Sequence, residues 1–128
     1  MKVPISVGEL FDKITILEIK KARIADEAKQ ANVNRELAAL NAIAGESLQL
    51  CDEGLRVVDE LRLVNTLLWD VEDQIRDCER HKDYGNRFVE LARSVYRYND
   101  QRALLKKRLN EVTGSELVEE KSYSDYGT

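Results

Sequence analysis

Apolar residues between positions 61 and 78 recur at intervals of three and four, and this spacing is what most constrains the fold. The stripe consists of Leu61, Val64, Leu68, Val71, Ile75 and Cys78. Because an α-helix has about 3.6 residues per turn, residues so spaced share one face of a long helix. The pattern therefore predicts a helix that buries this face against other parts of the chain.

Polar residues interrupt the same face. With about 100° of rotation per residue, four polar side chains project within roughly 60° of Leu61. They are Asn65, Glu72, Arg76 and Glu79. Burying an ionisable group is costly unless the group is paired or meets a ligand. The interruption thus predicts either a structural polar network or a binding site, and the sequence leaves both open.

Three further helices are expected from end signals and periodicity. Ser6 and Glu9 fit a capping box that begins the first helix, and Asp26 can cap the second. A break is expected at residues 51–54, and Thr113-Gly114 is a helix stop. The predicted helices cover residues 6 to about 24, 26–48, about 55 to 79 or 81, and about 87–112.

The composition agrees with an all-helical fold. The chain has one proline, six glycines and 34% charged residues, and no segment has the pattern of a strand. Short connections favour antiparallel neighbours, so we expect an all-α, up-and-down bundle of about four helices. We expect one domain over residues 1–128, with residues 114–128 forming a C-terminal arm. Leu117 and Val118 favour docking of the first half of that arm.

Charge and cysteine content disfavour several classes of protein. A net charge of −4 argues against general attraction to nucleic acid or to an anionic membrane surface. The chain has no membrane-spanning apolar run and does not begin like a secretory signal, which favours a cytoplasmic location. Cys51 and Cys78 fall on predicted apolar faces without a CxxC motif, so we interpret both as core residues. We predict no metal site and no cofactor.

The candidate site follows from pairing the third and fourth helices. If they pack antiparallel, Glu72 and Arg76 approach Asn99 and Arg102, and a lysine of the first helix completes the cluster. Arginine binds carboxylate or phosphate as a bidentate fork, and asparagine both donates and accepts. We therefore predict a small anionic metabolite as ligand, with Arg76 and Arg102 as clamps. The candidate ligand-binding residues are Lys13, Lys20, Asn65, Glu72, Arg76, Asn99 and Arg102.

Other interpretations remain open. Glu72, Arg76 and Arg102 could simply pair with one another and fix the helix register. The protein could be an adaptor that dimerises through apolar surface around Phe11 and Ile16, together with Trp69. It could also be an enzyme on an anionic substrate. The acid pairs Glu9/Asp12 and Asp70/Asp73 are similar to the Mg²⁺ ligands of all-helical nucleotide pyrophosphohydrolases.

Several segments together resemble a family of small bacterial proteins classed only as a domain of unknown function. The segments are VGELFDKITILEIK at 7–20, LWDVEDQIR at 68–76, FVELARSVYRYNDQR at 88–102 and GSELVEEKSY at 114–123. The resemblance spans nearly the whole chain and includes the Asp12-Lys13, Glu72-Asp73, Arg76, Asn99-Asp100 and Arg102 positions. Members tend to occur near glycosyltransferase and lipopolysaccharide-assembly genes. The resemblance thus implies an accessory role in envelope-sugar metabolism, with a glycosyltransferase as a candidate partner; the adaptor interpretation predicts a homodimer instead.

A fainter similarity is to the all-helical chorismate mutases, whose sites gather Arg, Lys, Glu and Gln from several helices around a dicarboxylate. The first helix here has an acid, aliphatic residues and late basic residues in a comparable order. It lacks a clear arginine near its start, and the third and fourth helices are longer than in that family.

Overall fold

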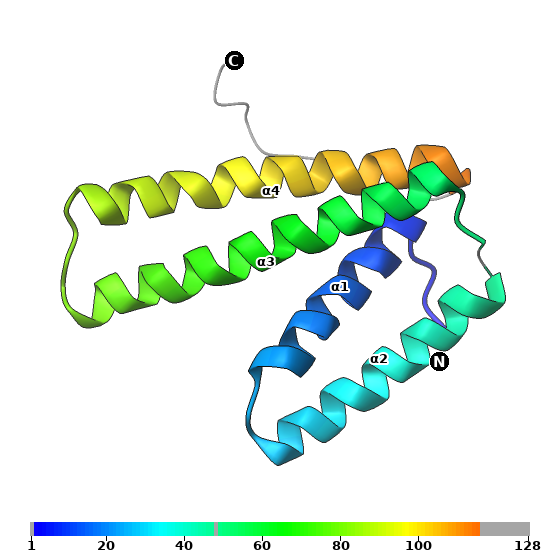
Figure 1. Cartoon of the computed structure of the whole chain (residues 1–128), viewed down its shortest axis with the longest axis horizontal. Helices are drawn as coiled ribbons and strands as arrows, with labels where there is room; N and C mark the ends of the chain where they lie inside the picture. The colour runs from blue at the N-terminus through cyan, green and yellow to red at the C-terminus, as the bar shows by residue number, and fades with distance from the viewer. Residues whose placement is uncertain (1, 48, 116–128) are drawn as a thin grey trace.

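A computed structural model describes residues 2–47 and 49–115, and within them the chain forms four α-helices. They are α1 (Val7–Arg23), α2 (Glu27–Ser47), α3 (Asp52–Arg80) and α4 (Asn86–Thr113), as Figure 1 shows. The prediction of an all-α fold with four helices is confirmed. The predicted C-terminal arm lies outside the described residues from position 116 onward.

The helix ends follow the local signals in the sequence. The Ser6 hydroxyl accepts a hydrogen bond from the backbone N–H of Glu9 at 3.1 Å, and the Asp26 carboxylate accepts one from Lys29 at 3.0 Å. Each bond satisfies a backbone donor that has no partner within the first helical turn. At the C-terminal end of α4, Gly114 adopts a left-handed conformation with φ 67°. That conformation carries no steric penalty in glycine, so the helix ends there.

The start of α3 and the role of Cys51 differ from expectation. The helix begins at Asp52, three residues before the predicted start at Leu55. Cys51 is the N-cap, and its Sγ accepts from the backbone N–H of Gly54 at 3.4 Å. Cys51 is exposed, so its assignment to the core is wrong, whereas Cys78 is buried as predicted. Periodicity alone does not separate a capping thiol from a packed one.

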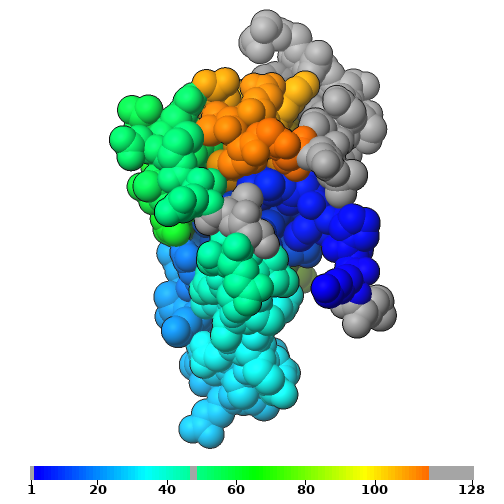
Figure 2. All heavy atoms as spheres, turned by 90° about the vertical axis from the view of Figure 1, so that its right-hand side faces the viewer, coloured from blue at the N-terminus to red at the C-terminus, as the bar shows by residue number. Residues whose placement is uncertain are grey.

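The four helices form two antiparallel hairpins. α1 contacts the other three helices, whereas among these helices α2 contacts only α1. Figure 1 shows the α1/α2 hairpin lying obliquely against one end of the longer α3/α4 hairpin. In Figure 2, α2 and the α3/α4 pair occupy opposite parts of the molecule, with α1 visible between them. α1 is therefore the central element that joins the two halves.

One face of α1 packs on α2. Leu10, Ile14 and Leu17 are at most 6% exposed and form a core cluster with Val33 and Leu37. Within each helix these residues recur at intervals of three or four and so share one face. Burial of a Leu or Ile side chain contributes about 1.5–3 kcal/mol, so this cluster holds the two helices together.

The other face of α1 packs on α3 and α4. Its buried residues are Gly8, Asp12, Thr15 and Ile19, which recur with helical spacing. A Cβ atom added at Gly8 would lie 2.4 Å from the backbone oxygen of Lys106. Only glycine permits such a close approach of the two helices. α1 is thus buried on two sides, and the side facing α3 and α4 is partly polar.

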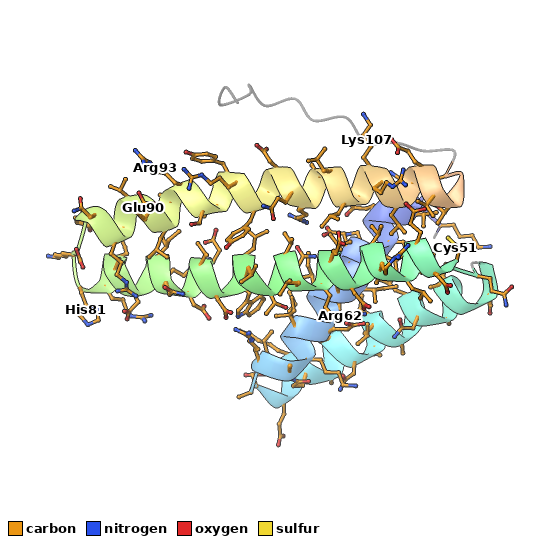
Figure 3. All side chains as sticks on the ribbon, turned by 45° about the horizontal axis from the view of Figure 1, so that its top comes forward. Cys51, Arg62, His81, Glu90, Arg93 and Lys107 are labelled. Carbon is orange, nitrogen blue, oxygen red and sulfur yellow. The ribbon has the colours of Figure 1, made fainter. Side chains whose placement is uncertain are left out.

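The far half of the α3/α4 hairpin extends beyond α1 and α2 (Figure 1). Figure 3 places His81 at its tip and Cys51 at the opposite end. Beyond Asn65, only Val71 and Cys78 of α3 are buried, and the buried residues of α4 are Leu109 and Asn110. The far half is therefore a two-helix layer whose apolar residues remain partly exposed.

Candidate functional site

A buried carboxylate, Asp12, joins α1 to α4. Its side chain is only 1% exposed, and Arg102 donates to it through Nε to Oδ1 at 2.8 Å and through Nη2 to Oδ2 at 2.5 Å. The guanidinium is 30% exposed. A two-pronged arrangement of this kind is the strongest form of arginine–carboxylate pairing. Asp12 is therefore the partner that neutralises Arg102.

Asn65 of α3 completes the environment of Asp12. Its Nδ2 donates to Asp12 Oδ1 at 3.0 Å and to Thr15 Oγ1 at 2.9 Å. The Thr15 hydroxyl in turn donates to the backbone oxygen of Asp12 at 2.9 Å. Asn65 is 4% exposed and Thr15 is fully buried. Buried polar groups are tolerated when they are hydrogen-bonded in this way, so these residues form a satisfied structural network.

Lys106 extends the network toward the start of α1. Its Nζ donates to Glu9 Oε2 at 2.7 Å and lies 4.0 Å from Asp12 Oδ2. Glu9 and Asp12 are thus engaged by cations of α4. They do not form the open acid pair expected for a Mg²⁺ site of the pyrophosphohydrolase kind. In the part of the chain that the structure describes, no group of three His, Cys, Asp or Glu side chains is placed to hold a metal ion.

A cleft lies between α1 and the α3/α4 hairpin, directly beside this network. Its volume is about 390 Å³. The lining residues are Ile16, Asn65, Leu68, Trp69, Glu72, Asp73, Arg76, Asn99 and Arg102. Five of the seven predicted site residues, Asn65, Glu72, Arg76, Asn99 and Arg102, therefore line one cleft. The structure thus brings these five residues together, and their role in binding a ligand stays a prediction.

The two predicted lysines lie elsewhere. Lys13 does not line the cleft; its side chain is 47% exposed, with Nζ 3.8 Å from Glu9 Oε1. Lys20 is half-buried and does not line the cleft either. Asp73, which the prediction did not include, is one of the lining residues. The cleft is consequently richer in carboxylates and poorer in cations than the sequence suggested.

The polar residues of the cleft fall into two groups. Asn65 and Arg102 hold Asp12, as described above. Glu72, Arg76 and Asn99 make no hydrogen bond or ion pair with any residue in the described ranges. Glu72 is half-buried, whereas Arg76 and Asn99 are exposed. The predicted internal pairing of Glu72 with Arg76 or Arg102 is thus replaced by the pairing of Arg102 with Asp12.

Two ion pairs fix α1 against α3 near the cleft. Arg62 Nε donates to Glu18 Oε2 at 2.6 Å, and Arg23 pairs with Asp70. The hydrogen bond to Glu18 raises the pKa of the Arg62 guanidinium above its usual value. Both pairs are partly exposed to solvent, so they contribute modestly to stability. They position the helix that carries Ile16, the α1 residue of the cleft.

The apolar set considered for an adaptor surface is divided between core and cleft. Phe11 packs against both core clusters of the protein. Ile16 and Trp69 line the cleft and are half-buried. These three side chains therefore do not form one exposed face. None of the described helices is both long and apolar enough to cross a membrane.

Comparison with known proteins identifies the chain by family. Neither a curated protein nor a solved structure matches it. A family model described as a family of unknown function, DUF6165, matches residues 1–126. Since that match spans almost the entire chain, the protein belongs to the DUF6165 family of unknown function.

Proposed function

We propose that the protein is a small-molecule binding module whose site is the cleft between α1 and the α3/α4 hairpin. The observation that supports this most is the division of its polar side chains. Buried Asn65 and half-buried Arg102 hold Asp12, whereas Glu72, Arg76 and Asn99 lie at the cleft without partners among the described residues. Ligand pockets commonly combine an apolar wall with a few polar groups of this kind.

Arg76 is the residue that would contact an acidic group of the ligand. Among the described residues that line the cleft, it is the cation that Asp12 does not neutralise. Its planar fork suits a carboxylate or a phosphate. The sequence suggested Arg102 as a second ligand-binding arginine. Because Arg102 is paired with Asp12, we assign it a structural role at the edge of the cleft. An accessory role in envelope-sugar metabolism, as the family resemblance implies, would fit a sugar derivative as ligand.

A single tryptophan makes this proposal testable. Trp69 is the only tryptophan of the chain and lines the cleft, so its fluorescence and its indole N–H signal in NMR report on the site itself. Wild-type protein is screened against amino acids, sugar phosphates, nucleotide sugars and dicarboxylates. We expect at least one compound to alter the Trp69 signals and to raise the melting temperature.

The matched variants are Arg76→Ala and Arg93→Ala. Arg93 pairs with Glu90 on the side of α4 that faces away from α3, as Figure 3 shows. Loss of one hydrogen bond to a charged group reduces affinity roughly 10- to 100-fold, and we expect this only for Arg76→Ala. Equal loss in both variants would indicate general charge attraction. Unchanged affinity in Arg76→Ala would contradict the proposal.

A further inference from the structure

The charges of the cleft restrict the kind of ligand it can hold. Among the described lining residues, Arg102 is paired with Asp12, which leaves Arg76 as the cation beside the carboxylates of Glu72 and Asp73. One positive and two negative side chains give these three a net charge of −1. Arg23 of α1 is not a lining residue; it pairs with Asp70 and also interacts electrostatically with Asp73. A ligand with only negative groups would meet Arg76 but would also lie next to two like charges, which is unfavourable. A ligand with a cationic group as well would satisfy both signs.

The order of residues along α3 suggests how such a ligand would lie. Leu68 and Trp69 form an apolar wall together with Ile16 of α1. The two carboxylates follow one turn later, and Arg76 follows a further turn on. At 1.5 Å per residue, Trp69 and Arg76 are separated by about 10 Å along the helix axis. The cleft therefore presents an apolar end, an acidic middle and a basic outer end.

We propose that the ligand is a zwitterion with an apolar ring face, and this inference rests on the proposed function of the cleft. The ring lies against Trp69, an ammonium group lies by Glu72 and Asp73, and a carboxylate or phosphate lies at Arg76. Asn99, across the cleft on α4, can donate to or accept from the polar portion. Aromatic amino acids and amino-sugar phosphates both have this chemistry.

Two matched series of compounds test the inference and distinguish aromatic amino acids from amino-sugar phosphates as ligands. The first is L-phenylalanine, 3-phenylpropionate without the ammonium group, and 2-phenylethylamine without the carboxylate. The second is glucosamine 6-phosphate, glucose 6-phosphate and glucosamine. Binding is read from the Trp69 indole N–H signal. In at least one series, we expect the zwitterion to bind at least tenfold more tightly than either of the analogues that carry charge of one sign only.

Charge-removing variants assign that preference to the cleft. Glu72→Gln should abolish most of the advantage of the zwitterion over the anion. Glu60→Gln serves as the control because Glu60 is an exposed acid of the same helix outside the cleft. The control should retain the full preference. A preference that survives in Glu72→Gln overturns the assignment of the ammonium group to this carboxylate.

The remaining outcomes distinguish the inference from the function on which it rests. If an anion without an ammonium group binds as tightly as the zwitterions, with dependence on Arg76, the zwitterion is excluded and a ligand site remains. The same conclusion follows if neither series binds but another anion in the wider screen does so. If no compound perturbs the Trp69 signal, both the inference and the proposed function are contradicted.

Discussion

Arg102 of α4 donates two hydrogen bonds to Asp12 of α1, from Nε to Oδ1 at 2.8 Å and from Nη2 to Oδ2 at 2.5 Å. The two partners differ in their access to water, because the side chain of Asp12 is 1% exposed and that of Arg102 is 30% exposed. Removing the arginine leaves a buried carboxylate that keeps only the hydrogen bond from Asn65 and the more distant charge of Lys106, 4.0 Å from Oδ2. Removing the aspartate leaves a guanidinium that already reaches solvent. The pair is therefore energetically asymmetric.

This asymmetry predicts the outcome of a double-mutant cycle. Arg102→Met is expected to lower the free energy of unfolding by about 3 kcal/mol, because the buried charge of Asp12 loses its bidentate partner and keeps only Asn65 and the more distant Lys106. The double variant Asp12→Leu/Arg102→Met should be more stable than Arg102→Met alone, since neither charge is then buried. Urea denaturation of wild type, Asp12→Leu, Arg102→Met and the double variant measures the coupling free energy between the two side chains. Simple addition of the two single losses would show that the pair is not coupled.

The contact of Gly8 with α4 predicts opposite effects for two glycine substitutions. In Gly8→Ala the new methyl group would lie 2.4 Å from the Lys106 backbone oxygen, and neither backbone can yield without separating the helices. We expect a loss of about 1–3 kcal/mol. Gly45 lies in α2 with no atom within 4 Å of an added Cβ. Gly45→Ala should therefore gain about 0.5–1 kcal/mol from its better helix propensity.

Thermal unfolding distinguishes these two variants readily. For a chain of this length, 1 kcal/mol corresponds to a change of about 4 °C in melting temperature. Gly8→Ala should therefore melt several degrees below wild type and Gly45→Ala a few degrees above it. Equal behaviour of the two variants would mean that the close approach of α1 and α4 is relieved at little cost.

Asn110 provides a cap for α1 from a distant part of the chain. Its Oδ1 accepts a hydrogen bond from the backbone N–H of Gly8 at 2.7 Å, and Asn110 is 3% exposed. Asn110→Ala leaves this buried donor unsatisfied and should cost about 1–3 kcal/mol. Asn110→Asp keeps an acceptor and adds a negative charge near the helix N-terminus, so it should be milder. Amide exchange of Gly8 should accelerate in the alanine variant only.

The sequence predicted most of the local structure because its signals are local. Ser6 and Asp26 bond to backbone groups three residues ahead, as the capping pattern requires. The end of α4 at Gly114 needs only a residue that tolerates positive φ. None of these features depends on how distant segments meet.

The composition of the candidate site was only partly predictable. Projection along α3 gathers Asn65, Glu72 and Arg76 on one side because they lie on a single helix. It does not reveal which residue of α1 faces them. Asp12 shares a helical spacing with Gly8 and Thr15, and this second stripe was the available signal. The apolar stripe that faces α2 is the stronger signal and obscures it, so the sequence favours lysines of α1 over the aspartate.

The far half of the α3/α4 hairpin should open more readily than the half that contacts α1. Most buried residues of α3 lie at or before Asn65, and those of α4 lie at positions 109 and 110. Local stability follows buried apolar contacts, and an isolated pair of helices has few. In native-state hydrogen exchange, amides of residues 70–80 and 88–98 should exchange faster than those of 57–65 and 105–112. Uniform protection along both helices would show that the far half is stabilised by contacts beyond those of the described residues.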